Sequence, residues 1–492
     1  MFAKTKTFYG WYVAICCSLV YFFVNSMTLF VPQNLFPRLM EEFSINQAEV
    51  SLTVANTLFY ASFLSPISGI LIDKYGVKIV IRIGIIIMAL IYSFYPFASS
   101  IETLYRLHIL MAVGLVMSGL GPNVIIVSRW FKKHRGKVVG MVVASSSLGG
   151  ATMPLMISPI VNNPNLGWRW GFGLLAVLFW LFAVIPVYKV IKPEPESMGL
   201  NPDGAESTEE EEVEAKDNVP LKQALLSRAL WCLGIGSACL WFSIQGLNSQ
   251  ISIFFEQEAG FTAQQSVFLF SILFWFSFIG KFGFGALSDK LPKRTVLLLS
   301  SIVLFLGSLL LFDFSGSEIT LTRNTTQLSL FTICFGLGFG GSFSMIQLVA
   351  VETFGKAYLG RILGIITLID GLGAAYGTKL LSELAVDSGS YFLPFGVVSA
   401  VTFFAIINVP MIDCPFRKIP TFSISGVIII KAGTNLKTKT SSTVRFPLTA
   451  KRVPIRKVAH IVTVAIAATI PAKYNFFSLN MFQLTKGLHD RR

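Results

Sequence analysis

The chain has 492 residues, of which 53% are hydrophobic and 13% charged, and its mean hydropathy is +0.66. A typical soluble domain has roughly 25% charged residues. The composition therefore excludes a disordered protein and argues against an ordinary soluble enzyme, and it indicates that the apolar excess lies in lipid. A formal net charge of +14 could indicate a nucleic-acid partner, so its location along the chain has to be established first.

Twelve segments are apolar and long enough to cross a hydrocarbon core of roughly 30 Å, which takes about 20 residues per helix. We predict membrane-spanning helices over residues 9–32, 50–72, 79–98, 103–128, 137–160, 169–191, 229–253, 264–288, 295–312, 328–351, 358–380 and 391–412. The first of these is interpreted as an uncleaved helix because it is long and eleven further spans follow it. Loops after the even-numbered spans carry the excess of Lys and Arg, which predicts cytoplasmic termini in a multi-pass protein of the plasma or cytoplasmic membrane.

A polar linker over residues 192–228 separates an N-terminal group of six spans (8–191) from a C-terminal group (229–412). Its Pro, Gly and carboxylate content, including the acidic run Glu209 to Glu212, cannot bury apolar surface. We therefore expect a flexible, solvated tether, with regulation by binding or phosphorylation as the alternative.

The two groups share a repeated motif. Gly69-Ile-Leu-Ile-Asp73-Lys74-Tyr-Gly76 ends the second span, and Gly285-Ala-Leu-Ser-Asp289-Lys290 ends the eighth. Two such matches in equivalent positions indicate parallel six-helix repeats, an internal symmetry found in secondary transporters.

Further motifs extend this pattern: Arg129-Trp-Phe-Lys-Lys-His-Arg135-Gly136, Gly167-Trp-Arg-Trp-Gly-Phe172, Pro195-Glu-Ser-Met-Gly-Leu-Asn-Pro-Asp-Gly204 and Phe335-Gly-Leu-Gly-Phe-Gly-Gly341. With them, residues 8–412 resemble the major facilitator superfamily, and within it the oxalate–formate exchanger and monocarboxylate transporter branch. The resemblance implies an all-α fold of twelve transmembrane helices in two six-helix halves. It also implies a monomeric secondary transporter that moves a small organic anion by alternating access, with no enzymatic activity, cofactor or metal.

The repeated motif has a physical logic of its own. Gly69 and Gly285 lack side chains, so a neighbouring helix can approach closely. Asp73 and Asp289 can accept backbone hydrogen bonds from a helix N-terminus of the opposite half. Lys74, Lys290, Arg129 and Arg361, with the loop glycine Gly76, complete a charge network, which the resemblance implies locks the cytoplasmic side. The alternative is that these charges only fix the topology.

Lys281 lies within the eighth span, about 12 Å from Asp289 by helix rise. Ionisable residues inside spans are costly and usually face a cavity. The position resembles that of the arginine that binds the substrate carboxylate in monocarboxylate and oxalate carriers, although Lys lacks the bidentate fork. The alternative for Lys281 is that its long stem reaches the cytoplasmic surface.

Asp370 lies near the middle of the eleventh span, where oxalate exchangers carry a second cation. We expect Asp370 to pair with Lys281 in the empty carrier and to take up a proton when substrate displaces it, which would make the carrier a proton symporter. A static ion pair or helix contact is the alternative. The first span has no Lys, and Ser277 stands one turn before Lys281, which argues against a lactate-type symporter.

Uncharged polar residues in the spans that line the cavity of the family are weaker candidates for solute contact: Asn25, Asn123, Gln245, Asn248 and Gln347. Asn34 also lies near the first span. For each of them, a hydrogen bond between helices is the competing interpretation. The glycine-rich stretch Phe335 to Gly341 is interpreted as a site of close helix packing.

The resemblance ends near residue 412. Residues 413–492 contain 14 Lys and Arg against Asp413 and Asp490, so the positive charge belongs mainly to this tail. Three interpretations remain: a disordered extension held on anionic lipid, a stretch that is not a selected protein segment, and a partner- or nucleic-acid-binding domain, for which no aromatic-interleaved basic motif exists.

For the carrier itself, the predicted partners are an organic anion, H⁺ and the bilayer, with no nucleic acid. The alternatives are a drug or sugar carrier and a membrane sensor that does not translocate. A membrane enzyme is a further alternative, but the sequence contains no catalytic motif that supports it.

Overall fold

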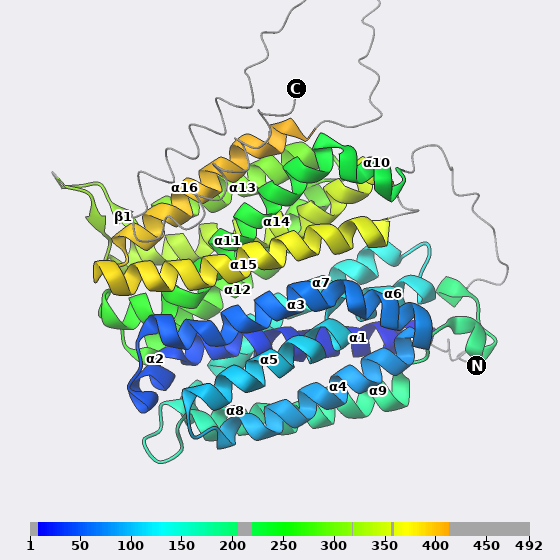
Figure 1. Cartoon of the computed structure of the whole chain (residues 1–492), viewed down its shortest axis with the longest axis horizontal. Coiled ribbons are helices and arrows are strands. Elements are labelled where there is room, and N and C mark those ends of the chain that lie inside the picture. Colours follow the sequence, from blue (N-terminus) through cyan, green and yellow to red (C-terminus); the bar gives the residue numbers. More distant parts are fainter. Residues whose placement is uncertain (1–7, 205–218, 317, 356–358, 413–492) are drawn as a thin grey trace, which may run out of the picture. The chain divides into compact units, whose positions relative to one another are not determined.

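A computed structural model describes residues 8–204, 219–316, 318–355 and 359–412 of the chain (Figure 1). These residues belong to one compact unit within Met1–Arg417. The predictions for the tail 413–492 and for the acidic run Glu209 to Glu212 concern residues outside the described part of the chain.

Helices make up nearly all of the described structure. The N-terminal group comprises α1 (Gly10–Asn25), η1 (Ser26–Phe30), α2 (Val31–Phe43), α3 (Gln47–Tyr75), α4 (Val77–Phe94), η2 (Tyr95–Phe97), α5 (Ile101–Ser118), α6 (Leu120–Trp130), α7 (Arg135–Val161), α8 (Gly167–Phe179), η3 (Trp180–Val184) and α9 (Ile185–Val190). The linker contributes η4 (Pro195–Met198), η5 (Pro202–Gly204) and α10 (Leu221–Leu226).

The C-terminal group comprises α11 (Arg228–Gln257), α12 (Ala263–Leu287), α13 (Lys293–Leu309), α14 (Thr325–Phe354), α15 (Leu359–Ser388), α16 (Phe392–Asn408) and η7 (Val409–Met411). Two short antiparallel strands, β1 (Phe312–Asp313) and β2 (Thr320–Leu321), lie between α13 and α14.

Within the described residues, 9 helical stretches are long and apolar enough to cross a membrane, which confirms a multi-pass membrane protein. All but the first match the predicted spans closely; the span predicted over 264–288, for example, is helix Ala263–Leu287. Of the other three predicted spans, α13 and α16 are 17 residues each, and α15 is not among the 9. The count of twelve, like the cytoplasmic position of the termini, therefore stays a prediction.

The first span continues beyond its predicted end at Pro32, as far as Phe43. Proline has no backbone N–H and normally breaks a helix. Here the π-helical segment Ser26–Phe30 directly precedes α2, so Pro32 falls in the first turn of α2, where a missing N–H is tolerated. The end predicted at Pro32 is wrong for this reason.

Glycines allow the helices of the C-terminal group to pack backbone against backbone. A Cβ at Gly336 or Gly340 of α14 would overlap carbonyl oxygens of α12, those of Leu273 and Ser277. A Cβ at Gly338 would overlap the α13 backbone at Leu304. The predicted close packing of this glycine-rich stretch is confirmed.

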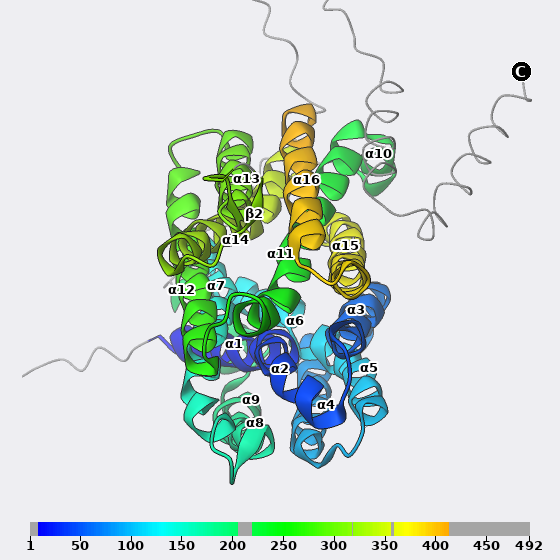
Figure 2. The ribbon, with the colours of Figure 1, turned by 90° about the vertical axis from the view of Figure 1, so that its left-hand side faces the viewer.

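The two groups meet along two main seams. In one, α3 packs against α15, and in the other α7 packs against α12, with α2 also contacting α11 (Figure 2). We call the end of the bundle that carries the α3–α4 and α12–α13 loops the signature end, and the end that carries the α2–α3 and α11–α12 connections the opposite end. Figure 1 shows the signature end at the right, near α6, and the opposite end at the left, near α2.

Candidate solute-binding site

Lys281 is buried at the seam between the two groups. Its side chain leaves α12, and Nζ donates hydrogen bonds to Val143 O and Ser146 Oγ of α7, both at 3.0 Å. The residue is 6% exposed. Because the ammonium group is bonded inside the bundle, it does not reach the surface, and the alternative interpretation of Lys281 is wrong. A cation from one group therefore contacts the backbone and a hydroxyl of the other.

Aromatic rings form the other side of the Lys281 environment. Nζ lies 4.4 Å from the ring centroid of Phe343 and 5.9 Å from that of Phe339, both on α14. Trp241 of α11 packs edge-on against Phe343 at 5.4 Å. Cations interact favourably with aromatic faces, more strongly when water is excluded. These rings thus stabilise the ammonium group, which has no carboxylate partner among the described residues.

Asp370 is buried in α15 and accepts a hydrogen bond from Ser237 Oγ of α11. Among the described residues, no ion pair joins it to Lys281, which corrects the predicted pairing. The physical reason is direction: Lys281 extends from α12 towards α7, whereas Asp370 faces α11.

The weaker candidates have different environments. Asn123 donates to the carbonyls of Ser118 and Gly119, so its NH₂ group stabilises the break between α5 and α6. Asn25 is buried at the end of α1, and Gln347 is half-buried in α14. For Asn123, a structural hydrogen-bonding role accounts for the amide nitrogen. Its Oδ1 has no partner among the described residues.

Gln245 and Asn248 of α11 are fully buried, and neither end of either amide has a hydrogen-bond partner among the described residues. Two further amides, Gln33 of α2 and Gln250 of α11, are fully buried as well and were not predicted. Gln33 lies directly beyond Pro32, where the predicted span ended, and next to the candidate Asn34. Gln250 could have been found as a third amide within six residues of α11.

At the signature end, the repeated motifs lie open. Nothing described lies within 4 Å of a Cβ built at Gly69 or Gly285, so the predicted close approach of a neighbouring helix is absent from this conformation. The charged residues of the motifs are all exposed, and no described ion pair includes them: Asp73, Lys74, Asp289, Lys290 and Arg361. Gly76 has φ +82°, a conformation that favours glycine, which explains its place in the loop.

Arg129 pairs with the linker instead of the motif carboxylates. Its Nη1 lies 2.9 Å from Glu194 Oε1, and both side chains are largely exposed. Next to it, Trp130 Nε1 donates to Lys192 O at 3.0 Å. The predicted charge network at this end is therefore not assembled in this conformation.

Asp203 fixes the linker to the N-terminal group more firmly. Its carboxylate accepts the backbone N–H groups of Lys132 and Lys133 at 2.7 Å each, and that of His134 at 3.3 Å. His134 is the N-cap of α7, where a helix dipole favours a negative charge. Residues 192–204 are thus bound to the α6–α7 loop, and the prediction of a flexible tether is wrong for them.

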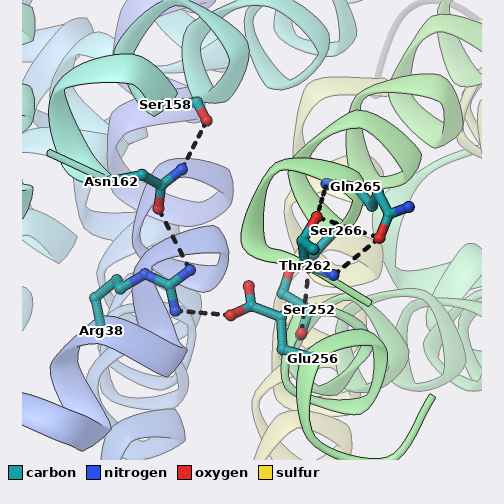
Figure 3. A network of polar contacts seen from close by, with 8 residues as sticks. All are labelled: Arg38, Ser158, Asn162, Ser252, Glu256, Thr262, Gln265 and Ser266. Carbon is teal, nitrogen blue, oxygen red and sulfur yellow. Dashed lines mark hydrogen bonds and ion pairs between the residues drawn. The ribbon is translucent and has the colours of Figure 1, made fainter. Parts of the chain in front are cut away.

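At the opposite end, a charged network joins the two groups (Figure 3). Arg38 of α2 forms an ion pair with Glu256 of α11, with 2.7 Å between Nη1 and Oε2. Arg38 Nη2 also donates to Asn162 Oδ1 at 3.4 Å, at the end of α7. Gln250 Nε2 donates to Ser51 Oγ of α3 at 3.0 Å. These contacts hold the groups together at this end, and lone charges in the sequence did not predict them.

The described residues contain no group of three or more His, Cys, Asp or Glu that could hold a metal ion. The fold and this site define an integral membrane protein whose buried polar residues follow the seam between two groups of helices. The model of the Major Facilitator Superfamily matches residues 17–378, and the chain belongs to this superfamily. Transporters of this superfamily are not enzymes.

Several relatives are similar to this chain over most of its length. It is 26% identical over 354 residues to an MFS-type transporter of Aspergillus fumigatus, covering 68% of this chain and 76% of the relative. It is 22% identical over 409 residues to monocarboxylate transporter 2 of Mus musculus, covering 78% and 79%. It is also 23% identical over 362 residues to the membrane sensor protein UhpC of Salmonella typhimurium, covering 69% and 77%.

Proposed function

We propose that this protein is a secondary active transporter of a small, monocarboxylate-like organic anion, working as a monomer in the plasma or cytoplasmic membrane with cytoplasmic termini. The likeness to monocarboxylate transporter 2 supports the substrate class. The excess of Lys and Arg in the loops of the signature end supports its position in the cytoplasm.

The observation that carries this proposal is the placement of Lys281. Its ammonium group from α12 donates to α7 across the seam, so it contacts both helix groups at once. A substrate carboxylate can replace Val143 O and Ser146 Oγ as the acceptor, because an ammonium bonds a charged carboxylate more strongly than a neutral carbonyl or hydroxyl oxygen. Substrate binding would then release a contact between the groups, which links binding to their relative motion.

Asp370 is the proposed proton site. It is buried in a membrane-spanning helix without a cation partner among the described residues, and its carboxylate has Ser237 Oγ as a donor. A buried carboxylate without a counter-charge is costly in a membrane. Uptake of a proton removes this cost, and Asp370 and Lys281 would then act as separate proton and substrate sites.

The ends of the bundle support alternating access. The Arg38–Glu256 pair and its neighbours join the groups at the opposite end, whereas at the signature end Asp73, Lys74, Asp289, Lys290 and Arg361 form no ion pair with any described residue. With the signature end in the cytoplasm, the structure corresponds to a conformation closed towards the outside. The proposed signature network, from Gly69 and Asp73 to Arg361, would assemble when the cytoplasmic side closes.

Uptake of labelled short carboxylates into proteoliposomes, with and without an inward proton gradient, tests the function. Loss of a charge-assisted bond worth about 1.5–3 kcal/mol should make Lys281→Ala about 10- to 150-fold less active. Lys281→Arg should retain part of the activity, and Lys189→Ala, which removes an exposed lysine of α9, should retain all of it. Full activity of Lys281→Ala would contradict the substrate role, and gradient-driven accumulation by Asp370→Asn would contradict the proton role.

A membrane sensor is the second candidate, because the chain is similar to UhpC over 69% of its length. A sensor would bind solute without moving it, so binding to the purified protein without uptake into liposomes would favour it. Competition by neutral sugars or cationic drugs for uptake would indicate a carrier of another solute class.

A further inference from the structure

Buried carboxamides gather on α2 and α11, between Lys281 and the ion pair of the opposite end. We call Gln33, Asn34, Gln245 and Asn248 the amide cluster. Asn34 is 8% exposed and the other three are fully buried. Both helices run towards the opposite end, and they contact each other.

One face of α11 connects the amide cluster to both neighbours. Trp241, Gln245, Asn248, Ser252 and Glu256 are spaced by three or four residues, so they share a face of the helix. The face begins at Trp241, which packs on the same Phe343 ring that Lys281 contacts. It ends at Glu256, which pairs with Arg38. By helix rise, Gln245 lies ~6 Å and Asn248 ~10 Å beyond Trp241.

The first span carries a similar series of residues on one face. Phe30 packs on Phe274 of α12 at 4.2 Å between ring centroids, and Gln33 and Asn34 follow it by one turn. Arg38 follows Asn34 by another turn. Aromatic rings, amides and an ion pair therefore follow in the same order on both helices.

The amides are unpaired to an unusual degree. Gln33, Gln245 and Asn248 have no partner for either the oxygen or the nitrogen among the described residues. The Asn34 nitrogen also has none. Each such buried group costs about 1–3 kcal/mol, which a hydrogen-bonding solute can offset. An alkyl chain cannot offset it, because it offers neither donors nor acceptors.

We propose that the amide cluster binds hydroxyl groups of the transported solute and that the substrate is therefore a polyhydroxylated carboxylate, of the sugar-acid class, in preference to an alkyl monocarboxylate. This inference rests on the proposed function, since it places the acid group at Lys281. Hydroxyl groups suit carboxamides because each can donate to an amide oxygen and accept from an amide nitrogen. No charged residue belongs to the cluster, so it selects for hydrogen bonding and not for a second charge.

Binding to the purified full chain, measured by the ligand-dependent rise in melting temperature, tests the proposal. The ligands are gluconate, hexanoate and the neutral sorbitol at equal ionic strength. Gluconate should bind at least about tenfold more tightly than hexanoate, because sites built for hydroxyl groups reject analogues that lack them. Equal binding of gluconate and hexanoate would overturn the proposal.

The variant Asn248→Leu removes one unpaired amide and keeps the side-chain size. It should weaken gluconate binding at least about tenfold, leave hexanoate binding unchanged, and raise the melting temperature of the unliganded protein. Asn408→Leu is the matched control, because the Asn408 amide already donates to Phe404 O within α16. Unchanged gluconate affinity in Asn248→Leu would contradict the role of the cluster.

Lys281→Ala separates this inference from the proposed function. If gluconate and hexanoate bind equally and both lose affinity in Lys281→Ala, the anion carrier stands and the role of the amides is wrong. If sorbitol binds as well as gluconate, and Lys281→Ala changes neither, the amides bind hydroxyl groups but the anion function is wrong. Loss of gluconate binding in both Lys281→Ala and Asn248→Leu is the result we expect.

Discussion

The two ends of the helix bundle differ in how their charges are used. At the opposite end, single charges that no motif marks, Arg38 and Glu256, pair between the groups with 2.7 Å between their atoms. At the signature end, the charges that the sequence repeats, such as Asp73 and Asp289, are exposed and form no described ion pair. A repeated motif thus need not mark a contact in the conformation observed, and an unmarked pair can provide one.

Glycines differ in the same way. Gly340 lies inside the C-terminal group, where a Cβ would overlap the backbone of α12. Gly285 belongs to the signature motif, and nothing described lies within 4 Å of its Cβ position. Glycines such as Gly340 are therefore needed for this structure, whereas Gly69 and Gly285 have open space around their Cβ positions and are needed, on our proposal, when the cytoplasmic side closes.

The largest effect is expected for this pair of glycines. Gly340→Ala should abolish most of the folded protein, since the clash involves the backbone oxygen of Ser277, which cannot rotate away. Gly285→Ala should fold normally and lose most of its uptake. Detergent-solubilised protein measured by size-exclusion chromatography reports the first result, and proteoliposome uptake the second. A normally folded Gly340→Ala, or an unfolded Gly285→Ala, would contradict the comparison.

The next effect concerns the ion pair that closes the opposite end. Arg38→Glu places two carboxylates where the pair was, so this end should open more often. Ser252→Cys, buried on the α11 face beneath Glu256, reports opening when an impermeant maleimide is added from outside to protein whose native cysteines are replaced. We expect labelling about tenfold faster, which corresponds to ~1.4 kcal/mol. The double variant Arg38→Glu with Glu256→Arg should label slowly again; if it stays fast, the pair does not hold this end.

The smallest effect is expected at the linker. Asp203→Asn keeps an acceptor but removes the charge that faces the backbone N–H groups of the α6–α7 loop. Bonds to charged groups contribute about 1.5–3 kcal/mol, so limited proteolysis of the linker should become several-fold faster while uptake falls about two- to threefold. Asp313→Asn is the matched control and should change neither, because the Asp313 carboxylate accepts from the N–H and hydroxyl of Ser315, far from the linker in the chain. Unaltered proteolysis would show that Asp203 does not hold the linker.

The spans could be predicted because a bilayer demands about 20 apolar residues per helix, and this demand leaves little freedom for their position. The family could be predicted because its motifs, such as the repeated Gly-x-x-x-Asp-Lys, are short and consist of residue types with a specific role in helix packing or charge pairing. The extension of the first span to Phe43 could not, since the rule that proline ends a helix does not anticipate the π-helical segment before Pro32.

The contacts of the site depended on tertiary structure. Lys281 was recognised as an ionisable residue inside a span, but its acceptors, Val143 and Ser146, are ordinary residues of a helix more than a hundred positions away. The pairing with Asp370 failed for the same reason, because two charges in spans reveal nothing about the directions of their side chains. Nothing in the sequence indicates that Arg38 and Glu256, which are 218 residues apart, form an ion pair.

The attachment of the linker has a mechanical consequence. On one side, Asp203 and Glu194 tie residues 192–204 to the N-terminal group, and on the other Val219 N donates to Phe354 O at the end of α14. Val219 follows Asp203 by 16 residues, and at ~3.3–3.6 Å per residue this stretch of chain reaches no further than about 58 Å. The linker therefore sets an upper limit on how far the two groups can swing apart at the signature end.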